Sequence, residues 1–117
     1  TLIHILENIQ VKTVSIQKTI DQFGPFSAVE RILMAVVQNG ANRQEIHEKL
    51  RQLSMKAWEA VQSGANNPLV ELVLHDQNIM QWITPDALQK LFDVKEYTGR
   101  AERLAREMAQ VIKQQIA

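Results

Sequence analysis

The sequence contains no cysteine among its 117 residues. It therefore has no disulfide framework, no thiolate nucleophile and no cysteine-ligated metal site, and it fits a reducing, cytoplasmic setting. It also lacks an excess of either charge, because 13 Lys and Arg residues balance 13 Asp and Glu residues. Nucleic-acid and membrane-surface binding both need a basic excess, and no apolar run approaches the roughly 20 residues of a membrane span. We therefore expect neither nucleic acid nor membrane as a partner.

Residues with catalytic or metal-binding potential are few and scattered. The four glycines are isolated, so there is no glycine-rich phosphate loop. His47-Glu48 begins like a zinc-protease helix, but Arg51 occupies the position of the second histidine. His4 and Glu7 lie one turn apart without a third ligand, and we interpret His75-Asp76 as a cap or a solvated part of a connector. We assign no catalytic, metal-binding or cofactor-binding residue.

A row of arginines near the C-terminus is the strongest candidate for anion binding. It is formed by Arg100, Arg103 and Arg106. Arginine presents a planar fork of donors that suits phosphate or carboxylate, and Thr98-Gly99 ahead of the row supplies backbone N–H groups at a helix start. The alternative, which we favour, is a solvated helix face paired with Glu102 and Glu107.

Hydrophobic periodicity predicts an all-α chain organised around a central helix at residues 25–40. Ser27 and Glu30 have the spacing of a capping box at its start, and Gly40 can take the left-handed conformation that ends it. Apolar residues occupy most of the circumference of this segment. We therefore expect other helices to cover it on several sides.

The next helix is predicted to begin after Asn42, its N-cap, and to end near Ser63. Its apolar residues recur at helical spacing: Ile46, Leu50, Leu53, Ala57 and Val61. The short link at residues 40–41 predicts that it folds back antiparallel on the central helix. Trp58, Met80 and Trp82 are interpreted as core or packing residues.

Shorter helices are expected on both sides of this pair. Asn67, Thr84 and Thr98 are predicted to cap three of them, with residues 93–98 as a connector. In the last helix one apolar face is predicted to meet a partner: Ala101, Leu104, Ala105, Met108, Val111 and Ile112, with Ile116 as a further candidate. Residues 11–23 are predicted to be helical in spite of their β-branched content, with a break near residues 11–13 and a stop at Gly24-Pro25.

Residues 1–10 read as the end of a longer helix. Their apolar residues form one stripe: Leu2, Ile5, Leu6 and Ile9. Because the chain begins at Thr1 within this helical pattern, we interpret it as a fragment of a longer protein.

Several segments carry a resemblance to a known family. They are Ser-Ala-Val-Glu-Arg-Ile-Leu-Met-Ala at residues 27–35, Gly-Ala-Asn-Arg-Gln-Glu-Ile-His-Glu-Lys-Leu-Arg at 40–51, Asn-Pro-Leu-Val-Glu at 67–71, Leu-Phe-Asp at 91–93 and Tyr-Thr-Gly-Arg-Ala at 97–101. In order and spacing they resemble the C-terminal domain of adenylosuccinate lyases, over roughly residues 25–115.

The resemblance implies an all-helical C-terminal domain of the fumarase/aspartase superfamily at residues 24–117. Residues 1–23 would be the tail of the central helical-bundle domain and a linker. Enzymes of this family are homotetramers whose active sites form where three subunits meet. They eliminate fumarate from adenylosuccinate, and from a related carboxamide ribotide of purine synthesis, with a general base and a general acid. The resemblance implies no metal and no organic cofactor.

The catalytic motifs of the family do not occur in this chain. Its Ser-Ser-x-Met-Pro-x-Lys-x-Asn loop has no counterpart, and His4, His47 and His75 match none of its histidine motifs. We therefore expect this chain alone to be inactive, with Arg43 and Arg100 open as residues that could approach an active site. Two other interpretations stay open. One is the C-terminal domain of a carboxymuconate cycloisomerase, but the Thr98-Gly99-Arg100 segment favours the lyase. The other is a stand-alone helical interaction module, but the start of the chain at Thr1 argues against it.

Overall fold

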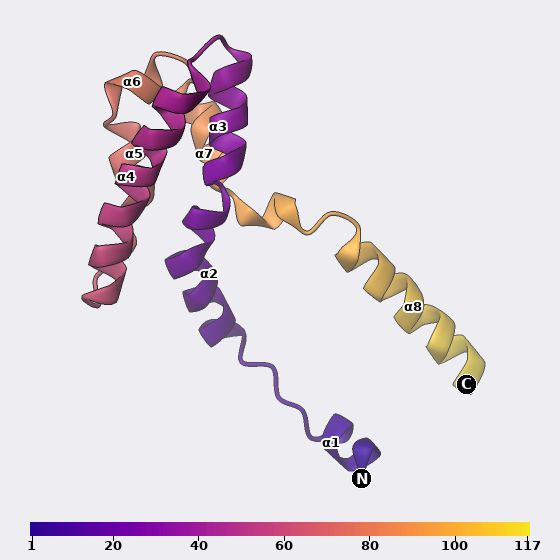
Figure 1. Ribbon diagram of the computed structural model, residues 1–117. Helices are drawn as coiled ribbons and strands as arrows, with labels where there is room; N and C mark the ends of the chain where they lie inside the picture. Colours follow the sequence, from indigo (N-terminus) through magenta and orange to yellow (C-terminus); the bar gives the residue numbers. More distant parts are fainter.

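The computed structural model describes residues 1–117 and contains helices and no strand (Figure 1). The elements are α1 (Leu2–Glu7), α2 (Thr13–Ser27), α3 (Val29–Gln38), α4 (Arg43–Gln62), α5 (Leu69–Leu74), α6 (Gln77–Met80), α7 (Pro85–Phe92), the 3₁₀ helix η1 (Val94–Tyr97) and α8 (Ala101–Ile116). The predicted all-α class is confirmed.

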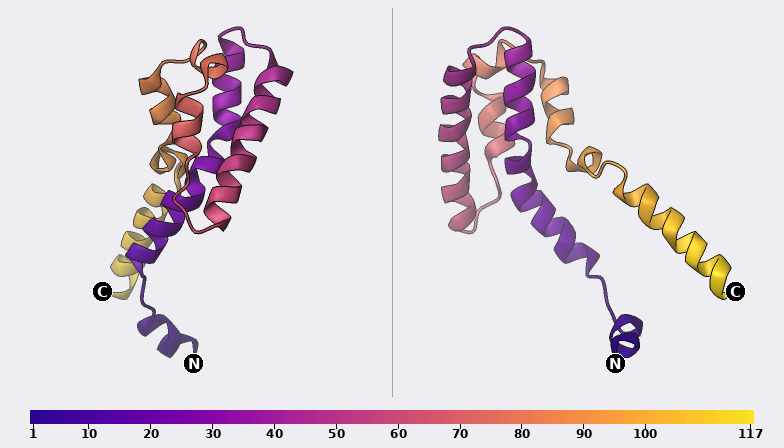
Figure 2. Two further views of the ribbon diagram at one scale, coloured as in Figure 1. Left: turned by 90° about the vertical axis from the view of Figure 1, so that its left-hand side faces the viewer. Right: turned by 45° about the vertical axis from the view of Figure 1, so that its right-hand side comes forward.

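Helices α3 to α7 pack together, while α1–α2 and α8 leave this core as two separate arms (Figures 1 and 2). The radius of gyration of the Cα atoms is 19.2 Å, and the molecule measures 58 × 34 × 22 Å. A compact chain of this length would have a radius of gyration of about 13 Å. The arms therefore account for the extended shape, and the core is confined to the part between them.

The helix that begins after Asn42 agrees with the sequence pattern. Oδ1 of Asn42 accepts hydrogen bonds from the backbone N–H groups of Gln44 (3.0 Å) and Glu45 (3.3 Å). The buried residues of α4 are the five that were predicted: Ile46, Leu50, Leu53, Ala57 and Val61. Gly40, with φ of +106°, makes the turn that leads from α3 into α4. The two helices are in contact, as the short link requires.

The central helix is shorter than predicted, and neighbouring helices cover most of its apolar residues. α3 contributes the buried residues Ile32, Leu33 and Val36 and packs against α4 and α7. Met34, in the middle of the helix, is 50% exposed. The partly buried Val29, Ala35 and Val37 also pack against the core, so the expectation that other helices cover this segment on several sides is confirmed except at Met34.

The prediction of a capping box at the start of this helix is wrong. α2 continues through Gly24 and Pro25 to Ser27, and α3 begins directly afterwards with Ala28 as an N-cap that makes no side-chain bond. The hydroxyl of Ser27 donates to the carbonyl of Gly24 at 2.6 Å. It is thus used within the last turn of α2 and does not cap α3. Pro25 lies in that last turn and does not stop the helix.

The outcome for the other predicted caps depends on the site. Thr84 caps α7 by accepting from the N–H of Ala87. Asn67 accepts from the N–H of Leu69 at 3.0 Å, although α5 begins at Leu69, one residue later than predicted. Thr98 does not cap α8, because its hydroxyl donates to the carbonyl of Lys95, and α8 begins after Arg100 without a side-chain cap. The connector at residues 93–98 contains the 3₁₀ helix η1.

The arms follow the predicted breaks but bury none of their residues. The chain leaves helical structure between α1 and α2, at residues 8–12, and residues 13–27 are helical rather than extended. None of the helices combines the length and apolarity that a bilayer crossing requires.

Candidate functional site

Glutamates on the same helix engage two of the three arginines near the C-terminus. On α8, Nε of Arg103 lies 3.3 Å from Oε1 of Glu107, and Nη2 of Arg106 lies 2.8 Å from Oε1 of Glu102. Such exposed pairs at i, i+4 stabilise a helix by about 0.3–0.5 kcal/mol each. The solvated-face interpretation is thus confirmed for Arg103 and Arg106, whereas Arg100 makes no ion pair.

The histidines do not converge on a metal site. Nδ1 of His4 lies 3.4 Å from Nδ2 of Asn8. Nδ1 of His75 lies 2.7 Å from the carbonyl oxygen of Glu71. No group of three or more His, Cys, Asp or Glu side chains is arranged to hold a metal ion.

Asp76 joins two parts of the core. Its Oδ1 accepts from the N–H of Ile79 at 3.1 Å and caps α6, as the sequence suggested for this connector. Its Oδ2 lies 3.1 Å from Nζ of Lys49 on α4, and its side chain is only 9% exposed. The pair fixes the α5–α6 connection against α4. We interpret it as structural, because both of its charges are already matched.

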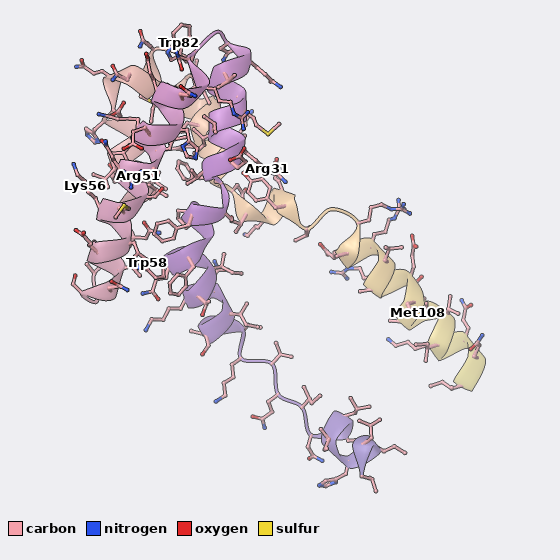
Figure 3. All side chains as sticks on the ribbon, viewed as in Figure 1. Arg31, Arg51, Lys56, Trp58, Trp82 and Met108 are labelled. Carbon is pink, nitrogen blue, oxygen red and sulfur yellow. The ribbon has the colours of Figure 1, made fainter.

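The segment that carries much of the family resemblance is anchored at the base of α3. The guanidinium Cζ of Arg31 lies 3.6 Å from the ring centroid of Tyr97, a cation–π contact that joins α3 to η1 (Figure 3 labels Arg31). The hydroxyl of Tyr97 is buried and has no hydrogen-bond partner. Sequence reasoning missed this contact, because no local pattern relates residues 31 and 97.

η1 also approaches α2 closely. A Cβ atom on Gly24 would lie 3.0 Å from Cγ1 of Val94, so the absence of a side chain at Gly24 permits the contact. η1 therefore connects both arms to the core.

Two charged contacts mark the surface of α4. Nη2 of Arg43 lies 3.5 Å from Oε1 of Glu30, at the exposed end where α3 and α4 meet. About two turns further along α4, Arg51 donates two hydrogen bonds to Glu48, at 2.7 and 2.8 Å, and Gln52 donates a third. These hydrogen bonds, of which those from Arg51 have the largest effect, lower the pKa of Glu48 from 4.5 to about 2. The same pairing raises the pKa of Arg51.

The tryptophans pack, but at the edge of the core. Trp58 is 45% exposed, and its ring lies 5.6 Å from Phe26 and 6.0 Å from Phe23, between centroids. It therefore fastens the second half of α2 to α4 (Figure 3). Trp82 and Met80 are half-buried against the core, as predicted.

The two arms carry exposed apolar faces that the core does not cover. In the first arm they comprise Leu2, Ile5, Leu6 and Ile9 near the N-terminus, and Ile16, Ile20 and Phe23 in α2. In the second arm they comprise Leu104, Met108, Val111 and Ile112 of α8. Monomeric proteins rarely expose contiguous apolar patches of this kind unless the patches bind something.

The fold and its surface thus define a class: an all-helical domain with two arms that expose apolar faces. A family model described as "Adenylosuccinate lyase C-terminus" matches residues 25–108. The chain belongs to this family, the C-terminal part of adenylosuccinate lyases, in agreement with the resemblance seen in the sequence.

Individual relatives give the same result. The chain is 34% identical to an adenylosuccinate lyase of Saccharomyces cerevisiae over 112 residues, which are 94% of this chain and 23% of the relative. It is 34% identical to an adenylosuccinate lyase of Schizosaccharomyces pombe over 103 residues, or 86% of this chain and 20% of the relative. For an adenylosuccinate lyase of Archaeoglobus fulgidus the identity is 26% over 116 residues, or 96% of this chain and 25% of the relative. The chain thus spans a quarter or less of the length of these relatives.

Proposed function

We propose that the chain is the C-terminal domain of an adenylosuccinate lyase, whose whole protein eliminates fumarate from adenylosuccinate and from the related carboxamide ribotide of purine nucleotide synthesis. The observation that carries the proposal is the family match over residues 25–108, together with relatives of that name aligned over most of the chain. The same observation favours this enzyme over a carboxymuconate cycloisomerase and over a stand-alone interaction module.

Within the whole protein, the proposed role of this chain is structural. Its buried residues are all apolar, and Arg103 and Arg106 pair with glutamates of their own helix, which supports this role. We propose that the domain supports the shape of a homotetramer and the lid of the active site. The nucleotide substrate would be bound mainly by other parts of the protein, and catalysis would need no metal or organic cofactor.

We further propose a division of the chain at residues 23 and 24, with residues 1–23 belonging to the end of a central helical bundle. The family match supports this division because it begins at residue 25. The exposed stripe of α1 supports it as well, because a bundle would cover that stripe. We place the protein in the cytoplasm, which suits a chain without cysteine.

The test is fumarate release from adenylosuccinate by the full-length protein, with the 117-residue chain as the matched control. We expect activity in the full-length protein and none in the chain, which would be checked for folding by its helical circular dichroism. A folded, tetrameric full-length protein without activity on adenylosuccinate would contradict the proposal. Carboxymuconate, offered in parallel, would then identify the cycloisomerase alternative. Activity in the isolated chain would contradict the structural role.

A further inference from the structure

The apolar faces of α2 and α8 have the same spacing in opposite chain directions. Read from its C-terminal end backwards, α2 presents Phe23, Ile20, Ile16 and Thr13 at steps of three, four and three residues. Read forwards, α8 presents Ala101, Leu104, Met108 and Val111 at the same steps. Alternating steps of three and four residues produce the seam along which two helices pack. The two seams therefore match in an antiparallel pair.

α2 ends, and α8 begins, on the same side of the core, next to η1 (Figure 1). η1 contacts α2, and Val94 lies against Gly24. α8 follows η1 after residues 98–100 (Figures 1 and 2). A groove lies at this junction, lined by Gln17, Ile20, Gly24, Phe92, Val94 and Thr98. Docking of α8 would thus extend a contact that η1 already makes with α2.

The link between η1 and α8 has the properties of a hinge. Gly99 has φ of +57°, a conformation that glycine adopts without strain, and there is open space around the position of its absent Cβ. Thr98 and Arg100 are exposed. α8 itself has no buried residue, and Figure 3 shows Met108 far from every other element.

We propose that α8 closes on α2 about Gly99 to form an antiparallel helical hairpin, with Phe23 opposite Ala101, Ile20 opposite Leu104, Ile16 opposite Met108 and Thr13 opposite Val111. Closure covers the apolar faces of both helices at once. It leaves the stripe of α1 outside, where it stays available to the rest of a longer protein.

The charges of α8 are compatible with this closure. Arg103, Arg106, Glu102 and Glu107 lie outside the apolar seam and already pair with one another along the helix. They remain in water when the seam is covered, so closure removes none of these four charged groups from solvent. This arrangement avoids the desolvation cost that a buried charge would bring.

The tether favours α2 of the same chain over a second copy as the occupant of the α8 seam. A short flexible linker gives an effective concentration on the order of 1 mM. A second chain at micromolar concentration therefore competes poorly for the same seam. Pairing of α8 with a second α8 would also leave the face of α2 exposed.

The first test uses disulfide formation, because the chain has no cysteine of its own. The variant Ile16→Cys/Met108→Cys places thiols at opposed positions of the seam, far from the hinge. The control Ile16→Cys/Gln110→Cys places the second thiol two residues away, outside the seam. We expect the first variant to form an intramolecular disulfide at least tenfold faster under mild oxidation, since a disulfide needs Cα atoms within about 7 Å. Equal rates, or a product that is mainly a cross-linked dimer, would overturn the proposal.

The second test measures the shape of the chain without cross-links. Small-angle scattering of the native chain should give a radius of gyration clearly below that of the variant Met108→Asp/Val111→Asp, in which two charges prevent closure. The control Gln110→Asp/Gln114→Asp adds the same charge to the polar face and should scatter like the native chain. The core folds independently of these positions, because α8 contributes no buried residue to it. Three identical radii, or a native radius that rises with protein concentration, would rule out closure within one chain.

Discussion

At the scale of single residues, Asp76 shows how one carboxylate can do two structural tasks. It caps α6 and pairs with Lys49. Two substitutions distinguish the contributions of these two contacts. Asp76→Ala removes both, and we expect it to lower the free energy of unfolding by about 1–2 kcal/mol, mostly through the lost cap. Asp76→Asn keeps a capping oxygen and should lose less than about 1 kcal/mol.

Urea denaturation of the two Asp76 variants measures this difference. Lys49 is 36% exposed and can turn into water once its partner is gone, so it adds little to the loss in either variant. Equal losses in both would show that the ion pair, and not the cap, stabilises this connection.

The Glu48–Arg51 contact makes a small part of the stability depend on pH. The pKa of Glu48 is lowered in the folded chain to about 2, from 4.5. Its contribution is therefore complete above pH 4.5 and is lost as the pH falls toward 2. Glu48→Gln should lower the thermal midpoint slightly at neutral pH. The difference from the native chain should vanish near pH 2, the pKa of Glu48 in the folded chain.

The control for this titration is Glu59→Gln on the same helix, where the carboxylate makes no side-chain hydrogen bond or ion pair. It should leave the slope of the thermal midpoint against pH almost unchanged. If Glu48→Gln left the slope unchanged as well, the contact with Arg51 would not persist in solution. Because the pair is exposed, added salt should reduce its effect.

At the scale of elements, α4 is the helix on which the core depends. Leu50 is 1% exposed, whereas Met55 on the same helix is 53% exposed. Leu50→Ala should reduce the free energy of unfolding by about 2–5 kcal/mol, since it removes buried methyl groups and leaves a cavity. Met55→Ala should cost much less, as exposed substitutions usually do.

Chemical denaturation of the two variants gives the comparison directly. A whole domain is stabilised by only about 5–15 kcal/mol, so Leu50→Ala should bring the chain close to unfolding. Similar losses in both variants would show that α4 does not bury the face that the structure assigns to it.

The sequence predicted α4 well because every signal for it is local. Asn42 marks the start, five apolar residues repeat at helical spacing and Gly64 follows the end. The start of α3 was predicted wrongly because two local uses of the same hydroxyl competed. Ser27 bonds back to Gly24 within α2, and Pro25 is tolerated in the last turn. Thr98 fails as a cap for the same reason, since Lys95 takes its hydrogen bond.

The contacts around the candidate site were less predictable than the helices. The solvated state of the arginine row follows from spacings of four residues along one helix, and it was predicted. The contacts of Arg31 with Tyr97 and of Trp58 with Phe23 join residues far apart in the chain. Only the tertiary fold brings such pairs together, so no periodicity or motif in the sequence indicates them.

At the scale of the whole molecule, the chain consists of a small core and two arms with uncovered apolar faces. The radius of gyration of 19.2 Å reflects these arms. If α8 closes on α2, the apolar stripe of α1 is the face that remains for the other parts of the proposed lyase. This stripe links the fold of the domain to the proposed assembly, and its state should differ between the chain and the full-length protein.

Amide hydrogen exchange can detect this difference. α1 has six residues and none is buried. Isolated helices shorter than about 12–15 residues are marginal in water, so its amides should exchange rapidly in the chain. In the full-length protein we expect the same amides to exchange at least a hundredfold more slowly, because a bundle covers Leu2, Ile5, Leu6 and Ile9. The amides of α4 serve as the internal control and should be protected in both forms, since that helix belongs to the core. Rapid exchange of α1 in the full-length protein, with α4 protected, would place residues 1–10 outside any bundle and would refute the proposed division of the chain.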